Sequence, residues 1–406
     1  LGGFLRRIFD PQSGIILDDP CANSVLAIHA LTGLAKKIEI PLSDRKVRAA
    51  MHRFVECEDE LKQLEREWTG IDYPEFSRIS SLLFGDAFDE VNRKIDRFEL
   101  LPKHGPGSTA DRLVGNQKWR FAEWTERMES VFPFREYAGP NLRESTRPSV
   151  HRPVGDERPV RVIAVPKTQK TPRIIAMEPT CMQYMQQGIS VALMKSAEKG
   201  LKALIAEAPG TSTVRSMSRA GGSDMEKPKG SFQTPIFPFT GFRDQELNQL
   251  LAREGSVSGA LATLDLSEAS DRVLNSHVLE MLRPWPSLSE GVQATRSRTA
   301  VLPAGTKVRL SKFASMGSAL CFPIEAMVFT TIVMLGIQDA LKTRLNSRSL
   351  VRLHGKVRVF GDDIIVPSDY AAAVVAKLEL FGLKVNADKS YVTGRFRESC
   401  GGDYFQ

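Results

Sequence analysis

The stretch KVRVFGDDIIVPS, residues 356–368, places two adjacent carboxylates, Asp362 and Asp363, between two apolar runs rich in β-branched residues. Such runs joined by a Gly-Asp pair predict two antiparallel strands with a tight hairpin turn. Adjacent like charges repel each other, and burial raises a carboxyl pKa unless a cation compensates. The tripeptide alone fits either a solvated turn or a metal site.

A second group of carboxylates lies upstream, in LDLSEASD at 264–271. The run GALATLDL (259–266) predicts a buried strand with Asp265 near its C-terminal end, and Asp271 follows after a short turn. If this strand lies beside the hairpin in one sheet, Asp265 and Asp362 can share one cation. Mg²⁺ prefers carboxylates and completes its shell with water and substrate phosphate. We therefore expect two Mg²⁺ ions, with Mn²⁺ as a substitute, and phosphoryl or nucleotidyl transfer.

The net charge of +7 and the pI near 9.1 favour a polyanionic partner. Residues 143–173 hold eight Lys or Arg and three acidic residues. Within this segment, VRVIAVPKTQKTPRIIAMEP (160–179) predicts two strands joined by a basic loop. Lys167, Lys170 and Arg173 on this loop can converge on a triphosphate, although a solvated charge run is the ordinary alternative.

The run FASMGSALCFPIEAMVFTTIVMLGI (313–337) begins with small residues and continues as a long apolar segment. Gly317 permits a close backbone approach to a ligand, and the Ser315 hydroxyl can contact a ribose or phosphate; ordinary helix-cap roles are the alternative. Because Pro323 and Glu325 interrupt the run, its length predicts a buried core helix, so we expect no membrane partner.

The remaining pattern predicts an α+β fold. The first 135 or so residues show helical periodicity, including a helix over 108–132 with Ser108 as its N-cap. From 259 onward the predicted order is strand, helix, long helix, hairpin, helix and strand, as in a small sheet backed by helices. The five cysteines are far apart and lack CxxC spacing, which predicts reduced thiols and no structural zinc.

Five segments, in this order, resemble the motifs of palm-type RNA-dependent RNA polymerases, most closely the replicase β subunits of the single-stranded RNA bacteriophages of the Q-beta type (leviviruses). They are VPKTQKTPRIIAMEP, ATLDLSEASDRV, ASMGSALCFPIEAMVF, VFGDDIIVPS and GLKVNADKSYVTGRFRESCG. The resemblance implies a right-hand polymerase: a helical N-terminal region and fingers over 1–249, including a basic hairpin at 158–176, and a palm over 250–406 with a small antiparallel sheet backed by helices. The thumb of this family is expected beyond residue 406.

The resemblance also implies roles for individual residues. The family's metal ligands fall on Asp265, Asp362 and Asp363, of which Asp363 is the less direct. Its triphosphate-binding residues fall on Lys167, Lys170 and Arg173. Asp271 and Ser315 match positions near the incoming ribose, where the 2′-hydroxyl distinguishes RNA from DNA. Gly317 is expected to bind the nucleotide as well. Lys389 matches a lysine proposed as the general acid for the pyrophosphate leaving group.

The expected partners are an RNA template and product and ribonucleoside triphosphates, in the cytoplasm of a bacterial host. The resemblance adds the host elongation factors Tu and Ts and a small-subunit ribosomal protein. A reverse transcriptase is one alternative, although Gly361 and the polar SEASD segment argue against it. A non-catalytic RNA-binding protein is another, and it predicts that Asp265 and Asp362 lie far apart.

Overall fold

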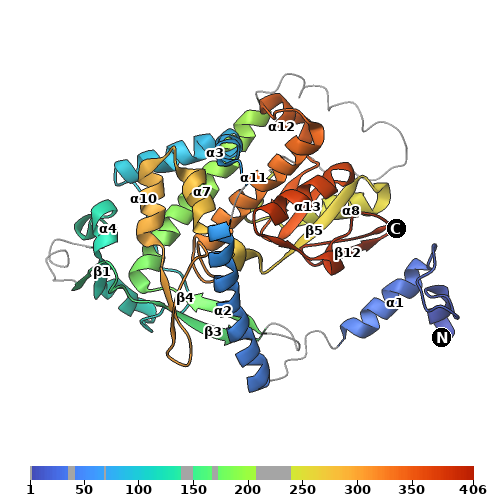
Figure 1. The fold of residues 1–406 in the computed structure, drawn as a ribbon, viewed down its shortest axis with the longest axis horizontal. Coiled ribbons are helices and arrows are strands. Elements are labelled where there is room, and N and C mark those ends of the chain that lie inside the picture. Colours follow the sequence, from blue (N-terminus) through green and yellow to red (C-terminus); the bar gives the residue numbers. More distant parts are fainter. Residues whose placement is uncertain (1, 35–41, 68–69, 139–149, 167–171, 207–238) are drawn as a thin grey trace, which may run out of the picture.

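The computed structural model describes residues 2–34, 42–67, 70–138, 150–166, 172–206 and 239–406 (Figure 1). It is a mixed helix-and-sheet molecule, as the sequence predicted at this coarse level. Two four-stranded sheets position the residues of interest. Lys167 and Lys170 lie outside the described residues.

The first sheet has the strand order β10-β5-β9-β8. Its strands are β5 (Leu261–Ser267), β8 (Arg358–Phe360), β9 (Asp363–Pro367) and β10 (Lys384–Val385), and every pairing is antiparallel. The predicted hairpin at 356–368 is therefore confirmed as β8 and β9. Gly361 has a φ of +58°, which glycine adopts readily in a tight turn.

Side chains alternate between the two faces of this sheet. Leu264 and Ile364 join the main core, which includes helices α11 (Cys321–Leu341) and α13 (Ala371–Leu380). Leu261 and Ile365 belong to a separate cluster with α8 (Glu246–Ser258), so this helix covers the opposite face. The hairpin of β11 (Phe396–Ser399) and β12 (Gly402–Phe405) packs beside α8.

The second sheet has the order β4-β3-β6-β7. The predicted basic hairpin is confirmed as the antiparallel pair β3 (Val160–Val165) and β4 (Arg173–Met177). Strand β6 (Thr299–Val301) pairs in parallel with β3, and β7 (Lys307–Arg309) closes the sheet. Residues from both sides of position 250 therefore contribute to one sheet.

Helices surround the two sheets (Figure 1). These helices are α2 (Asp44–Glu67), α3 (Tyr73–Asp96), α7 (Thr180–Ala206), α9 (Asn275–Leu282) and α10 (Pro286–Thr295). The remaining α-helices and strands are α1 (Ala22–Gly33), α4 (Glu126–Val131), α5 (Phe134–Tyr137), α12 (Ser347–Leu353), β1 (Glu123–Thr125) and β2 (Val150–Arg152). Among the described residues, α11 alone has the length and apolarity of a membrane span, and 89% of its most apolar window is buried inside the molecule, as expected of a core helix.

The predicted helix over 108–132 was wrong. The chain forms a 3₁₀ turn at Gly115–Arg120, then β1 and the short α4. Phe121 has a φ of +41°, which no α-helix accommodates, and its ring packs against His104 and Tyr184. Tertiary aromatic packing thus overrides a helical periodicity at this site. The five cysteines are free, as predicted.

Candidate active site

The two predicted carboxylate groups meet across one pair of strands. Asp265 on β5 lies directly opposite Asp363 on β9, and Asp362 occupies the turn that precedes β9. Directly opposed residues of an antiparallel pair project from the same face of the sheet. The register therefore brings residues from distant parts of the chain to the same end of the two central strands.

Asp265 is half-buried and sits in a mixed electrostatic environment. Burial raises the pKa of its carboxyl group; the Lys389 ammonium opposes this effect, and the negative charge of Asp362 adds to it. The Lys389 Nζ lies 3.9 Å from Asp265 Oδ1, and Asn386 Nδ2 donates a hydrogen bond of 3.0 Å to Oδ2. The backbone N–H of Asp265 also donates to Ser390 Oγ at 3.1 Å. The segment around β10 thus holds Asp265 in place and brings Lys389 beside it.

The two adjacent aspartates differ in their surroundings. Asp362 is exposed at the turn. Asp363 is partly buried, and its Oδ1 accepts hydrogen bonds from the Cys400 N–H at 3.0 Å and from Ser399 Oγ at 3.2 Å. Cys400 has a φ of +50°, an uncommon conformation for a non-glycine residue. The β11–β12 hairpin therefore anchors Asp363 and leaves Asp362 free to face solvent.

Glu325 on α11 is a further acidic residue near this end of the sheet. Burial raises the pKa of its carboxyl group to about 8, a hydrogen bond with Ser270 opposes the shift, and the charge of Asp362 adds to it. The Cys321 Sγ lies 3.6 Å from Glu325 Oε2 and donates to it. Burial thus favours the neutral form of Glu325, on a helix that contacts both the turn that carries Asp271 and strand β8.

The residues predicted near the nucleotide have distinct environments. Asp271 Oδ1 accepts a hydrogen bond of 2.8 Å from Lys312 Nζ. Ser315 is buried, and among the described residues its hydroxyl has no hydrogen-bond partner. Gly317 has a φ of +129°, and a Cβ there would lie 2.1 Å from the carbonyl oxygen of Ala176 on β4. The close backbone approach at Gly317 is thus to the basic hairpin. Arg173 is exposed at the first position of β4.

A divalent metal ion fits the chemistry of the carboxylates at this end of the sheet, although they do not form a complete coordination shell. Within the described ranges, no group of three or more His, Cys, Asp or Glu side chains is arranged to hold a metal ion. Mg²⁺ is usually bound by one or two carboxylates together with water and substrate phosphates. Asp265 and Asp362 supply two carboxylates whose mutual repulsion a cation would relieve.

Several relevant residues were not found from the sequence. Asn386, Ser399 and Cys400 hold the aspartates through contacts that no local pattern signals. Lys312 was missed because a single lysine beside a buried segment gives no sign of its partner. The segment that contains Asn386 was visible only as part of the NADKS element.

Comparison with known proteins agrees with the sequence motifs. Residues 241–406 match the family model described as RNA replicase, beta-chain. Over these residues, which we call the replicase region, the chain is similar to RNA replicase beta-chains. This replicase region includes Asp265, Asp362, Asp363 and Lys389, whereas the basic hairpin and α2 precede it.

Curated relatives extend this similarity toward the N-terminus. The chain is 27% identical over 392 residues to the RNA-directed RNA polymerase subunit beta of Enterobacteria phage SP, which covers 90% of this chain and 56% of that protein. It is 30% identical over 245 residues to the RNA-directed RNA polymerase beta chain of Escherichia phage MS2, which covers 60% of this chain and 35% of that protein. The chain thus spans between about a third and just over half of the length of these relatives.

Among solved structures, the crystal structure of an insertion-loop deletion mutant of the RNA-dependent RNA polymerase of a human picobirnavirus matches with a TM-score of 0.36 and 12% identity. The match covers 60% of this chain and 43% of that chain.

Proposed function

We propose that the chain carries the catalytic centre of an RNA-directed RNA polymerase, with its fingers within 1–249 and its palm within 250–406. The reaction is template-directed attack of an RNA 3′-hydroxyl on the α-phosphate of a ribonucleoside triphosphate, with release of pyrophosphate. The observation that carries the proposal is the register of β5 and β9, which sets Asp265 opposite Asp363 and next to Asp362. A non-catalytic RNA-binding protein has no need for this arrangement.

In this proposal Asp265 and Asp362 would hold two Mg²⁺ ions, for which Mn²⁺ can substitute, and Asp363 would support them. Bound metal would activate the attacking hydroxyl and neutralise charge on the phosphates. Asp265 is positioned by Asn386 and Ser390, so its carboxylate needs little reorganisation to bind a cation. Lys389, exposed and beside Asp265, can donate a proton to the leaving pyrophosphate.

The other residues of the proposal orient the nucleotide. Lys167, Lys170 and Arg173 would bind the triphosphate, and the exposure of Arg173 at the start of β4 supports this role. Asp271, Ser315 and Gly317 would lie at the ribose end; the buried Ser315 hydroxyl has no hydrogen-bond partner among the described residues. Positioning of this kind lowers the barrier by fixing the reacting atoms before the reaction begins.

Extension of a primed RNA by the protein tests the proposal. With ribonucleotides and Mg²⁺ we expect template-dependent extension, and with deoxyribonucleotides we expect much less; efficient use of deoxyribonucleotides would favour the reverse-transcriptase alternative. Asp362→Asn should lower extension at least about a hundredfold, because it removes a principal charge at the reacting phosphate, and leave RNA affinity unchanged. Asp369→Asn, an exposed acid beyond the other end of β9, is the matched control. Retained synthesis by Asp362→Asn would refute the role of Asp362.

The same proposal places the protein in the cytoplasm of an infected bacterium, bound to template and product RNA. It includes elongation factors Tu and Ts and a small-subunit ribosomal protein as partners. Affinity purification of the tagged protein from bacterial lysate, followed by peptide mass mapping, checks these partners. A partner that is not enriched over an unrelated tagged protein would be removed from the proposal.

A further inference from the structure

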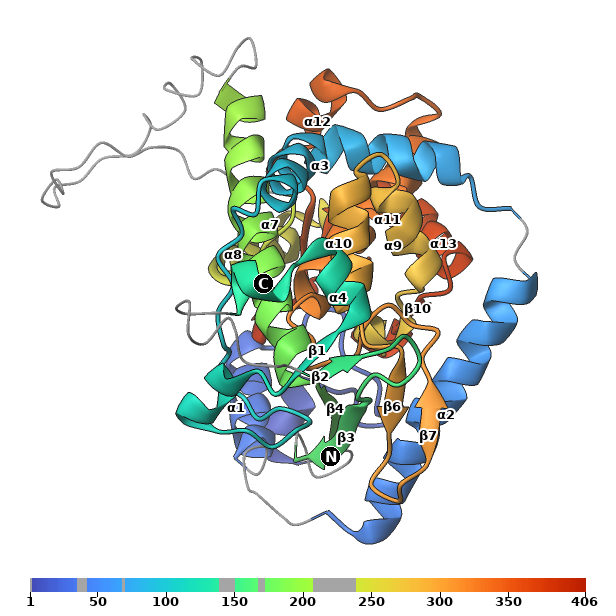
Figure 2. The ribbon, with the colours of Figure 1, turned by 90° about the vertical axis from the view of Figure 1, so that its left-hand side faces the viewer.

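Helix α2 contacts strands β3 and β4 of the second sheet and also the turn after β5. In Figure 2, α2 runs along the outer side of the molecule, in the half that holds this sheet. Arg53, Cys57 and Glu60 recur at helical spacing and therefore share one face, and Phe54 and Glu58 adjoin it. This face of α2 contacts both parts of the proposed nucleotide site, although α2 lies outside the replicase region. The proposed function gave α2 no role.

The N-terminal part of this face belongs to the basic hairpin's core. Phe54 is 4% exposed and packs in a cluster with Val160, Val162 and Ala176 of β3 and β4. Met51 and Val55 lie against the same cluster. Burial of this apolar surface fixes α2 to the sheet that carries Arg173.

The middle of the face reaches Asp271 through a buried ion chain. Glu58 and Lys312 have fully buried side chains, and Lys312 Nζ lies 3.1 Å from Glu58 Oε1 and 2.8 Å from Asp271 Oδ1. Glu58 Oε2 also accepts a hydrogen bond from the Ser311 N–H at 2.5 Å. Lys312 Nζ makes a cation–π contact with Phe54, 3.6 Å from the centroid of the ring. The Asp271 side chain remains 28% exposed, so it is held on one side and open on the other.

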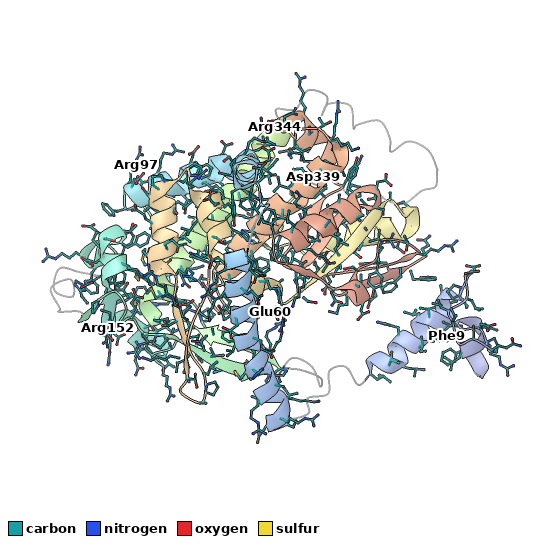
Figure 3. All side chains as sticks on the ribbon, in the orientation of Figure 1. Phe9, Glu60, Arg97, Arg152, Asp339 and Arg344 are labelled. Carbon is teal, nitrogen blue, oxygen red and sulfur yellow. The ribbon has the colours of Figure 1, made fainter. Side chains whose placement is uncertain are left out.

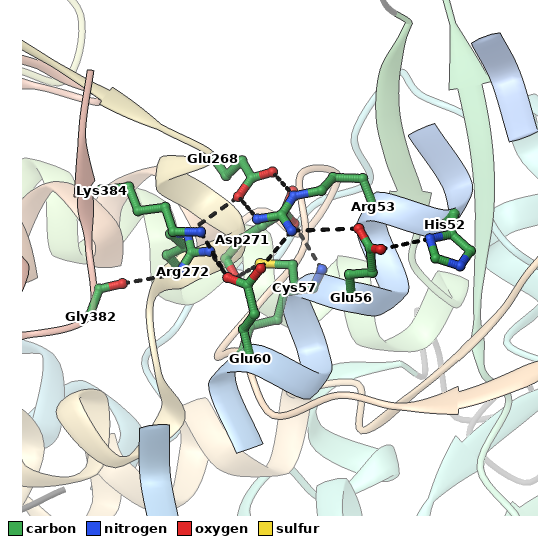
Figure 4. Close-up of polar contacts among 11 residues, drawn as sticks. His52, Arg53, Glu56, Cys57, Glu60, Glu268, Asp271, Arg272, Gly382 and Lys384 are labelled. Carbon is green, nitrogen blue, oxygen red and sulfur yellow. Dashed lines mark hydrogen bonds and ion pairs between the residues drawn. The ribbon is translucent and has the colours of Figure 1, made fainter. Parts of the chain in front are cut away.

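Arg53 and Glu60 on this face hold the turn itself (Figure 4). Arg53 pairs with Glu268 at 2.5 Å and with Glu60 at 2.6 Å, and Arg272, 1% exposed, pairs with both of these acids. Glu60 also accepts from Lys384 Nζ on β10 at 2.9 Å. Glu60 thus lies where α2 meets the middle of the molecule (Figure 3).

Glu58 and Lys312 are fully buried, whereas Arg53 and Glu60 are about a third exposed. Replacing buried ion pairs by well-packed apolar residues is often neutral or stabilising, so the buried pair of Glu58 and Lys312 is weak evidence for stability and a geometric role is the hypothesis to test. Glu268 has a φ of +55°, and both of its carboxylate oxygens are bound by arginines. The turn that carries Asp271 is therefore held in one conformation from the α2 side.

We propose that α2 fixes the position of Asp271 relative to the basic hairpin, and that Glu58 and Lys312 are positioning residues for recognition of the nucleotide ribose. The inference rests on the proposed function, which places Asp271 at the ribose. It adds that ribose selection depends on a helix outside the replicase region. Lys312 holds the Asp271 carboxylate, and Glu58 holds Lys312.

The test compares the binding of ATP and dATP to the protein in Mg²⁺ by isothermal titration calorimetry. A primed RNA is present whose primer ends in a 3′-deoxynucleotide, so that neither nucleotide is incorporated. The readout is the ratio of the two dissociation constants. The double variant Glu58→Gln/Lys312→Met removes both buried charges together, because Lys312→Met alone leaves Glu58 buried and unpaired and can fail to fold. Lys62→Met removes a lysine from an exposed ion pair with Asp59 on the same helix and is the matched control.

We expect the wild type and Lys62→Met to bind ATP more tightly than dATP. In the double variant the affinity for ATP should fall about tenfold and the affinity for dATP should stay unchanged, because a charge-assisted hydrogen bond that orients Asp271 is lost. A folded double variant that keeps the wild-type ratio would overturn the inference. Equal loss of affinity for both nucleotides would also overturn it, because it indicates a merely structural role. A wild type that binds neither nucleotide would refute the proposed function itself, and the inference with it.

Discussion

Substitution of Gly317 by alanine tests the closest backbone approach near the candidate site. Gly317 has a φ of +129°, and a Cβ there would lie 2.1 Å from the Ala176 carbonyl oxygen and 2.9 Å from its carbon. The Ala176 N–H donates to the Met316 carbonyl at 2.8 Å, so the loop before α11 is bonded to β4 at the same point. Because the overlapping atoms belong to backbone, no side-chain rotation can relieve the contact.

The expected cost has two parts. A non-glycine residue in this region of φ costs about 1–3 kcal/mol. Forcing an extra methyl group into a packed contact costs a further ~1–3 kcal/mol. The free energy of unfolding should therefore fall by roughly 2–6 kcal/mol in Gly317→Ala.

Gly305→Ala separates the two parts. Gly305 in the β6–β7 turn has a φ of +86°, and no heavy atom lies within 4 Å of the position that a Cβ would take, so its substitution carries the backbone cost alone. Urea unfolding followed by circular dichroism gives both free energies on the same protein. We expect Gly317→Ala to lose ~1–3 kcal/mol more than Gly305→Ala.

The outcome also distinguishes two roles for Gly317. Equal losses in the two variants would refute the close contact with Ala176. A Gly317→Ala protein of wild-type stability with weakened nucleotide binding would show that the glycine admits a ligand and not the hairpin.

Three further predictions concern single residues. Arg173→Ala should raise the apparent KM for ribonucleotides several-fold, by loss of a charge-assisted phosphate contact, whereas Arg309→Ala at the opposite edge of the sheet should not; an unchanged KM in extension assays would contradict the phosphate role. Burial lowers the pKa of His277 to about 4, so its neutral form stabilises the fold by ~3 kcal/mol above pH 6.5, and this is lost as the pH falls toward 4. His277→Gln should flatten that pH dependence in urea unfolding, and exposed His52→Gln should leave it as in the wild type. Hydrogen bonds from a serine lower the pKa of the Cys21 thiol, so iodoacetamide followed by peptide mass mapping should find it alkylated before the other cysteines, whose pKa values burial raises; earlier labelling of a buried cysteine would contradict this order.

The local parts of the fold could be predicted because their signals are local. The hairpin of β8 and β9 follows from two β-branched runs around Gly361, and the basic hairpin follows from the same pattern around a proline-bounded loop. The meeting of Asp265 with Asp362 and Asp363 required one more assumption, that β5 lies beside β9, and the motif order supplied it.

The remaining contacts depend on tertiary packing that sequence periodicity does not encode. Glu58 and Lys312 are separated by most of the chain, and each alone looks like a solvated charge. The aromatic packing of Phe121 likewise overrides the helical periodicity around it. Ion chains and aromatic clusters of this kind become visible only when the elements are placed in space.

The two adjacent aspartates have unequal surroundings. Burial raises the pKa of the Asp363 carboxyl group, and the hydrogen bonds that its Oδ1 accepts from the Cys400 N–H and the Ser399 hydroxyl oppose this shift only in part. Asp362 is exposed, and its charge acts on Asp265 across the strand pair. One carboxylate is therefore held by the β11–β12 hairpin, and the other remains exposed and available to a cation. Because Asp363 is anchored on both the β5 side and the hairpin side, the turn that carries Asp362 is fixed beside Asp265.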